Sequence, residues 1–102
     1  ELVAEDPATA MEYLAPVIEN TPGAAAFNLM AQANQTIGNG EQAIKDYAMS
    51  LDFDPKQADV YYDRGHLRLK AGDNEGACYD WQHALNLGHR KAADMLYKYC
   101  RK

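Results

Sequence analysis

Matched residue types recur along this chain at a spacing of 34 residues, and this period constrains the fold more than any other feature. Aromatic residues stand at Tyr13, Tyr47 and Trp81. The same spacing joins Ala10, Ile44 and Cys78, then Val17, Leu51 and Leu85, and the pairs Ala43 and Ala77, Gly38 and Gly72, Glu41 and Glu75, and Phe27 and Tyr61. A repeated unit of this length is one supersecondary element that buries its apolar side against its neighbours.

Within each period the sequence predicts a helix, a turn and a second helix. The first helix of the central unit is expected to end near Gly38, because glycine readily adopts the left-handed conformation that ends helices. The second covers residues 40–51, where apolar residues stand at helical spacing. Asp54 and Pro55 then restart the chain, with Asp54 as the cap and Pro55 at the first helical position. The next unit repeats this plan, with its turn at residues 72–73.

This pattern resembles the tetratricopeptide repeat, whose 34-residue unit is a pair of antiparallel helices. One full unit, residues 24–55, carries the motif residues Phe27, Ala31, Gly38, Ala43, Tyr47 and Pro55. A second, residues 58–88, carries Tyr61, Gly65, Gly72, Ala77 and Trp81, and is followed by His89 in place of the closing proline. Asn34 and Arg68 stand where the family favours tyrosine, and Arg64 stands where it favours leucine. The last junction also resembles Sel-like helical repeats, through Ala77, Trp81, Ala84, Gly88, Ala92 and Leu96.

The resemblance implies an all-α fold: a right-handed solenoid of antiparallel helix pairs, with about six helices in a single array over residues 1–102. Residues 7–20 match the second helix of a partial repeat, and Pro16 is expected to kink it. Residues 90–101 are expected to form a C-terminal capping helix with a polar outer side. Because the apolar side of residues 7–20 lacks its partner helix, we expect it to pack on a second copy, as a homodimer, or on a missing segment of the parent protein.

The stretch of residues 76–89 holds a cysteine, an aspartate, a tryptophan and two histidines, as a metal or catalytic cluster would. Cys78 and His83 lie roughly 140° apart on an ideal helix, and Asp80 also points away, so these side chains do not form a local metal site. The apolar positions share one helical side, which predicts packing instead. His66, His83 and His89 are expected at the surface or in turns. Since no catalytic motif appears, the sequence predicts no enzyme, no cofactor and no metal site.

The two cysteines form a pair in this scheme. Cys78 lies eleven residues before His89 and Cys100 eleven after it. Because helices joined by a tight turn run antiparallel, both sulfurs are expected at the same height on inward sides. Two alternatives follow: buried reduced cysteines, which suit a cytoplasmic protein, or a disulfide that holds the capping helix to the last full unit. A disulfide would indicate an exported or periplasmic location.

The first helices of tetratricopeptide units line a concave groove that binds extended peptides or partner helices. The residues that match these positions are Asn28, Gln32, Gln35, Asp59, Tyr62, Asp63, His66 and Lys70. One branch of the family holds C-terminal carboxylates with a lysine, asparagine and arginine clamp, which is absent here, and Asp59 and Asp63 would repel such a terminus. The expected partner is therefore a basic or neutral protein segment. The alternative is that these polar residues are only a solvated surface.

Composition narrows the function further. Apolar residues make up 47% of the 102 residues, enough for a core, and no apolar run approaches the ~18 residues of a membrane span. Residues 1–63 carry a net charge of −9 and residues 64–102 carry +4. This asymmetry suggests a basic partner or head-to-tail association, although bases near the end of a final helix also complement its dipole. An acidic chain without interleaved aromatic and basic residues is a poor candidate for nucleic-acid binding.

Two functions therefore stay open. The first is a protein–protein interaction scaffold that binds a peptide or partner helix in a concave groove. The alternative is a structural or assembly element that stacks on other copies or on the rest of a larger exported protein.

Overall fold

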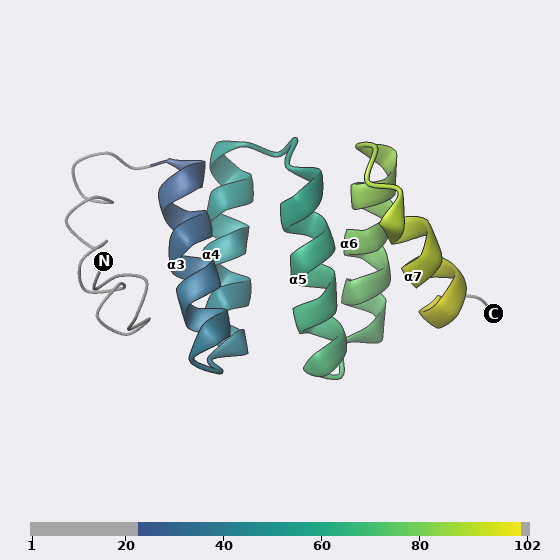
Figure 1. The fold of residues 1–102 in the computed structure, drawn as a ribbon, viewed down its shortest axis with the longest axis horizontal. Coiled ribbons are helices and arrows are strands. Elements are labelled where there is room, and N and C mark those ends of the chain that lie inside the picture. Colours follow the sequence, from purple (N-terminus) through teal and green to yellow (C-terminus); the bar gives the residue numbers. More distant parts are fainter. Residues whose placement is uncertain (1–22, 101–102) are drawn as a thin grey trace. The chain divides into compact units, whose positions relative to one another are not determined.

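The computed structural model describes residues 23–100, which form five α-helices and no strand (Figure 1). The helices are α3 (Ala24–Thr36), α4 (Gly40–Phe53), α5 (Ala58–Lys70), α6 (Asn74–Asn86) and α7 (Lys91–Tyr99). The helix expected at residues 7–20, and the homodimer contact expected through it, lie outside the described residues. The chain divides between Pro55 and Lys56 into two compact units. The first contains the hairpin α3–α4, and the second contains the hairpin α5–α6 followed by α7.

The helical turns are closed by glycines with a left-handed backbone, as the sequence predicted. Their φ angles are 87° at Gly38, 88° at Gly72 and 102° at Gly88. In the second unit, the amide of Asp73 donates to the carbonyl of Arg68 at 2.8 Å, which ends α5. The side chain of Asp73 also accepts a hydrogen bond from the amide of Gly76 at 2.9 Å, which caps α6. Asn39 makes the equivalent contacts in the first unit, so each hairpin reverses direction within a few residues.

The start of α5 differs from the prediction. The helix begins at Ala58 rather than at Pro55. Asp54 has an extended backbone, with φ −145° and ψ 97°, and it ends α4 instead of capping α5. A residue that precedes proline is disfavoured from the helical region, because the proline ring clashes with it. The carbonyl of Gln57 accepts hydrogen bonds from two backbone amides at 3.2 Å and opens α5.

Two large aromatic residues occupy equivalent buried positions in the two hairpins. Tyr47 is 1% exposed in the first unit and Trp81 is 0% exposed in the second. Tyr13, the third ring of the series, lies outside the described residues. A methyl group added at Gly65 would lie 2.6 Å from Nε1 of Trp81, so the indole requires a glycine there. In the first unit, the position equivalent to Gly65 is Ala31, and the position equivalent to Trp81 is Tyr47, whose ring is smaller.

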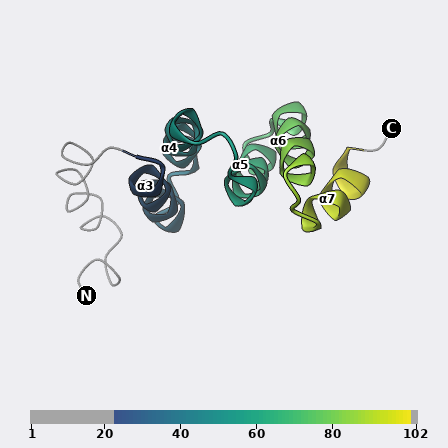
Figure 2. The ribbon, with the colours of Figure 1, turned by 90° about the horizontal axis from the view of Figure 1, so that it is seen from above.

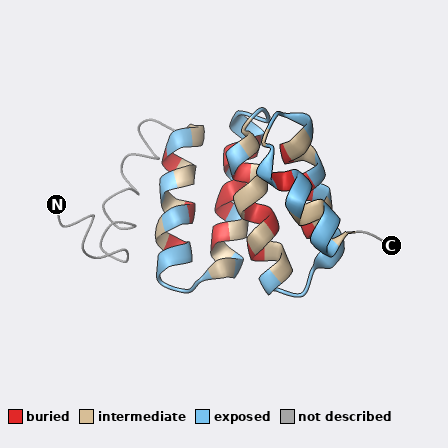
Figure 3. Cartoon of the chain, turned by 45° about the vertical axis from the view of Figure 1, so that its right-hand side comes forward, coloured by how far each residue is buried: buried red, intermediate tan, exposed pale blue. Residues whose placement is uncertain are grey.

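The core of the second unit includes α7, which lies beside α6 (Figure 2). Four residues at its centre are fully buried, namely Ala77, Trp81, Ala84 and Ala92. Partly buried side chains pack around them, namely Tyr61, Tyr62, Leu69, Leu85, Met95, Leu96 and Cys100. The buried residues follow the sides on which the helices of this unit meet (Figure 3). The final helix is therefore integral to this core.

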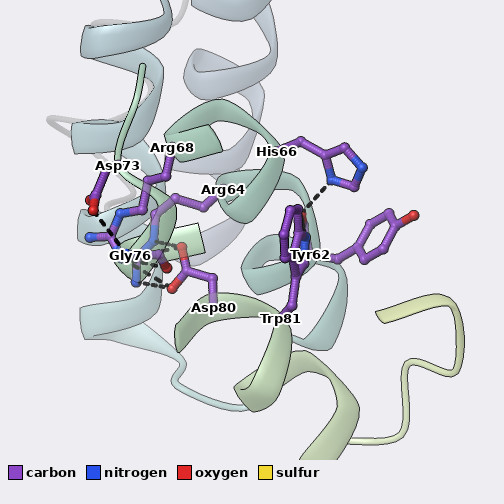
Figure 4. Close-up of polar contacts among 8 residues, drawn as sticks. All are labelled: Tyr62, Arg64, His66, Arg68, Asp73, Gly76, Asp80 and Trp81. Atoms are coloured by element: carbon purple, nitrogen blue, oxygen red, sulfur yellow. Dashed lines mark hydrogen bonds and ion pairs between the residues drawn. The ribbon is translucent and has the colours of Figure 1, made fainter. Parts of the chain in front are cut away.

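A buried ion-pair network joins α5 to α6. Asp80 is fully buried and accepts hydrogen bonds from Nε and Nη2 of Arg64 at 2.9 and 2.8 Å (Figure 4). A third contact comes from Nη1 of Arg68 at 3.3 Å. A buried carboxylate is tolerated when cations and hydrogen bonds compensate for its lost hydration. Arg64 and Arg68, which stand where the tetratricopeptide pattern has leucine and tyrosine, are thus the donors of this network, a role that the sequence did not predict.

In the first unit, a buried carboxylate is bonded by neutral side-chain amides instead of arginines. Asp46, which lies 34 residues before Asp80, is buried as well. It accepts hydrogen bonds from the side-chain amides of Asn34 at 2.7 Å and Gln42 at 3.0 Å. Asn34 is in turn the counterpart of Arg68. Each hairpin thus joins its helices through a buried carboxylate, with amide donors in one unit and guanidinium donors in the other.

Candidate partner-binding surface

The α5 residues expected to bind a partner lie along one side of that helix. They are Asp59, Tyr62, Asp63, His66 and Lys70, and together we call them the α5 face. Spacings of three, four and seven residues put them on one side of the helix, away from the side that buries Val60, Arg64 and Leu67. Asp59 and Lys70 are exposed, whereas Tyr62, Asp63 and His66 are half-buried.

Tyr62 is held in place by contacts with its backbone and its ring. Its carbonyl accepts a hydrogen bond from Nε1 of Trp81 at 3.3 Å, and Nδ1 of His66 lies 3.0 Å from the same oxygen (Figure 4). The imidazole of His66 is tilted against the Tyr62 ring at a centroid distance of 4.6 Å. The imidazole of His89 stacks on that ring at 4.1 Å. Tyr62 is therefore a pre-positioned aromatic group at the centre of the α5 face.

His89 belongs to this surface, although the sequence analysis did not include it among the binding residues. It lies in the connection between α6 and α7, and its Nε2 is 3.3 Å from Oδ1 of Asp59. The Asp59 side chain is 90% exposed, whereas that of His89 is 17% exposed. The one available signal was that a histidine replaces the closing proline of the motif. That departure says nothing of where the side chain points, because its direction depends on the packing of α7.

The carboxyl group of Asp63 is the electrostatically unusual member of the α5 face. Burial raises its pKa above the ordinary value, and the negative charge of Asp59 raises it further. His66 and His89 act in the opposite direction. Among residues 23–100, no hydrogen bond or ion pair holds this carboxyl group. A half-buried carboxylate without a donor is disfavoured in the free protein and is stabilised by a cation that approaches it.

The remaining predicted binding residues belong to α3, in the first unit. Asn28, Gln32 and Gln35 share one side of that helix. Asn28 is half-buried, and the two glutamines are exposed. Oε1 of Gln35 accepts a weak hydrogen bond from the hydroxyl of Tyr47 at 3.4 Å. This side of α3 carries amides and no charge, so it offers hydrogen bonds but little electrostatic preference.

The cysteine pair lies where α7 packs on α6. Sγ of Cys78 and Sγ of Cys100 are 2.05 Å apart, at disulfide distance, and the Cα atoms are 5.9 Å apart. Cys78 belongs to the start of α6, and Cys100 follows the end of α7. A bond between them closes the segment that contains His89.

The histidines make ring contacts in the second unit. His83 stacks on Tyr61 at a centroid distance of 4.9 Å and contacts Tyr79 at 4.4 Å.

No group of three or more histidine, cysteine, aspartate or glutamate side chains within residues 23–100 is arranged to hold a metal ion. None of the five helices described is both long and apolar enough to cross a membrane.

No protein-family model matches the sequence, and no curated protein matches it either. The chain is similar to a solved structure of PcrH in complex with the chaperone binding region of PopD, with a TM-score of 0.88 and 19% identity over 97% of this chain and 82% of that one. It is also similar to two structures of MamA, with TM-scores of 0.73 and 0.76 and 23% identity. These matches cover 79% and 80% of this chain but 45% and 48% of the MamA chains, so the protein spans less than half of their length. The similarities confirm the predicted all-α class of tetratricopeptide-like helical solenoids.

Proposed function

We propose that this protein is an interaction scaffold that binds a peptide or a partner helix on the exposed sides of the first helices of its repeats. The repeats are residues 24–55 and 58–88, with residues 90–101 as the cap. The binding residues are Asn28, Gln32, Gln35, Asp59, Tyr62, Asp63, His66 and Lys70, and His89 completes the α5 face. We assign no catalytic activity to this arrangement.

The observation that carries the proposal is that the α5 face combines an aromatic ring held by its neighbours with a half-buried carboxyl group. A hydrogen bond from Trp81 holds the Tyr62 backbone, and the rings of His66 and His89 pack against its side chain. The Asp63 carboxyl group beside it is half-buried, and no donor among residues 23–100 bonds it. An aromatic ring that is already held in place, next to a carboxyl group that lacks a donor, is typical of a binding surface. Binding then costs less entropy, because the ring is ordered in the free protein.

The similarity in fold to PcrH supports the same function, since the structure of that protein contains the chaperone binding region of PopD. At 19% identity the likeness carries no information about which segment binds here. The acidic pair on α5 favours a basic or neutral segment over a C-terminal carboxylate.

Site-specific photocrosslinking tests the proposal. Benzoylphenylalanine placed at Lys70 or at Gln32, both exposed on the proposed binding sides, should crosslink a partner in an extract of the source cells. The same group at the exposed Gln82 of α6 is the matched control and should not. The crosslinked protein would then be purified, and its affinity should fall for Asp63→Asn but not for Asp94→Asn. Equal crosslinking from Gln82, or equal affinities, would contradict the proposal.

The alternative, an assembly element, has support in the opposite charges of the two units. Residues 1–55 carry a net charge of −8 and residues 56–102 carry +3. Head-to-tail stacking of copies would pair these charges, and a homodimer through residues 7–20 is a further form of the same proposal. Sedimentation that depends on protein and salt concentration would favour assembly. A species that stays monomeric across both ranges would favour the scaffold.

The cysteine pair bears on where the protein is located in the cell. We infer a disulfide between Cys78 and Cys100, and with it the exported or periplasmic alternative, because disulfides persist in oxidising compartments. A Sel-like character of the last junction accords with the three alanines that form a buried cluster with Trp81, namely Ala77 and Ala84 of α6 and Ala92 of α7. Intact mass with and without reductant tests the bond, and two alkylatable thiols in protein isolated from the source would exclude it.

A further inference from the structure

Within the described part of the chain, no lysine or arginine pairs with the carboxyl group of Asp63. Asp59 precedes it by one helical turn on the same side of α5. Arg64 and Arg68, the arginines of this helix, are directed to Asp80 on the buried side. The charged or titratable groups that act on Asp63 are Asp59, His66 and His89. The edge of α5 that holds Asp59 and Asp63 therefore carries two carboxylates, and none of the groups that act on Asp63 is a lysine or an arginine.

The ring of Tyr62 lies between these groups in sequence and is held by the stack with His89. An aromatic group beside two carboxylates suits a cation with a hydrocarbon stem, because the stem packs on the ring while the charged end meets the carboxylates. Burial of Asp63 strengthens such a contact, since part of the dehydration of the carboxylate has already occurred in the free protein.

We propose that the α5 face recognises a lysine or arginine side chain of the bound segment, placed against Tyr62 and between the carboxylates of Asp59 and Asp63. This inference rests on the proposed scaffold function and narrows it, because it excludes a purely neutral partner. It assigns Tyr62 and Asp63 the main role and Asp59 a supporting one, since the exposed carboxylate of Asp59 is already in contact with His89.

The test uses the whole chain and two small probes. Nα-acetyl-arginine amide is titrated into isotope-labelled protein at low salt, and the nearly isosteric, uncharged Nα-acetyl-citrulline amide is titrated in parallel, both followed by NMR. We expect the arginine probe to shift the amide signals of Asp59, Tyr62 and Asp63 and to bind about three- to fivefold more tightly than citrulline, the range of a partly exposed ion pair. The Asp63 carboxyl signal should also titrate at lower pH with the arginine probe present.

Two variants test whether Asp63 is the source of the preference for arginine. Asp63→Asn should abolish the preference for arginine over citrulline, and Asp94→Asn, at an exposed aspartate of α7, should keep it. Lowering the pH until the Asp63 carboxyl group is protonated should weaken arginine binding, because the neutral form no longer attracts the cation. Burial raises the pKa of Asp63, so this loss should begin at a higher pH than for an ordinary aspartate. Equal affinities for the two probes, shifts centred on other acidic residues, or a preference that survives Asp63→Asn would each overturn the inference.

The outcome is separable from that of the proposed function. If crosslinking identifies a partner at Gln32 and Lys70 while the two probes bind equally, the scaffold stands and cation recognition fails. If the probes discriminate but no partner crosslinks, cation recognition stands and the scaffold assignment fails.

Discussion

Replacing Gly65 with alanine tests the close packing of α5 on α6. The added methyl carbon would lie 2.6 and 2.8 Å from two atoms of the Trp81 indole. Because carbon contacts are favourable near about 3.5 Å, the ring or the helix has to move by roughly 0.9 Å. Such overpacking costs about 1–3 kcal/mol. Movement of the ring also weakens the hydrogen bond from Trp81 to the Tyr62 carbonyl, which contributes about 1 kcal/mol.

One effect opposes this loss. Alanine favours a helix over glycine by about 1 kcal/mol, so the net decrease in the free energy of unfolding should be about 1–3 kcal/mol. Urea unfolding measures it by the fluorescence of Trp81, the one tryptophan of the chain, which reports on the second unit. The midpoint should fall by about 1 M or more. The matched variant Ala31→Gly in the first unit should lose stability for two reasons, because glycine has the lower helix propensity and because the buried methyl group of Ala31 is removed.

A double-mutant cycle isolates the contact. Trp81→Tyr introduces the smaller ring that stands at the equivalent position of the first unit, and it should lower stability by leaving a cavity. Combined with Gly65→Ala, it should cost less than the sum of the two single changes by about 1 kcal/mol or more, as followed by far-UV circular dichroism. A Gly65→Ala variant as stable as the wild type, or strictly additive changes, would refute the argument that the indole and the glycine are fitted to each other.

The remaining predictions concern the buried network, the α5 face and the cysteine pair. Asp80→Ala leaves the buried guanidinium of Arg64 without its acceptor and should lower the free energy of unfolding by about 3–5 kcal/mol in urea, whereas a loss under about 1 kcal/mol would contradict the network. Asp63→Asn should leave stability at pH 7 unchanged or higher, because a carboxyl group whose pKa is raised in the folded state contributes stability only while protonated, and any gain should shrink as the pH falls through that pKa. Joint replacement of Cys78 and Cys100 by serine should lower the thermal midpoint measured under oxidising conditions, since closing 22 residues of sequence with a disulfide contributes about 3 kcal/mol. The same replacement should have no effect in reductant, and a loss that persists there would assign the effect to packing.

Much of the local structure was predictable because it depends on neighbours in sequence. Gly38 and Gly72 end helices by their backbone freedom, whatever lies around them. The spacing of Tyr47 and Trp81 was enough to place both rings in equivalent buried positions. The start of α5 was misjudged for a related local reason, since the effect of Pro55 on the residue before it was given less weight than its preference for the first helical turn.

The candidate surface was predictable in part. Asp59, Tyr62 and Asp63 could be put on one side of α5 from helical geometry alone. That Asp63 is half-buried, with no donor among residues 23–100, was not predictable, because burial depends on what packs beside the helix. His89 was missed because it comes from the connection to α7, and its ring meets Tyr62 only once that helix has packed.

The amino-acid sequence by itself determined the repeat, the helices and their turns, because periodicity and backbone preference act over a few residues. Only the tertiary structure decided which donors satisfy Asp80, why Gly65 must lack a side chain, and how His89 joins the α5 face. Each of these depends on atoms from different helices that meet at particular distances, and spacing along one helix does not specify such distances.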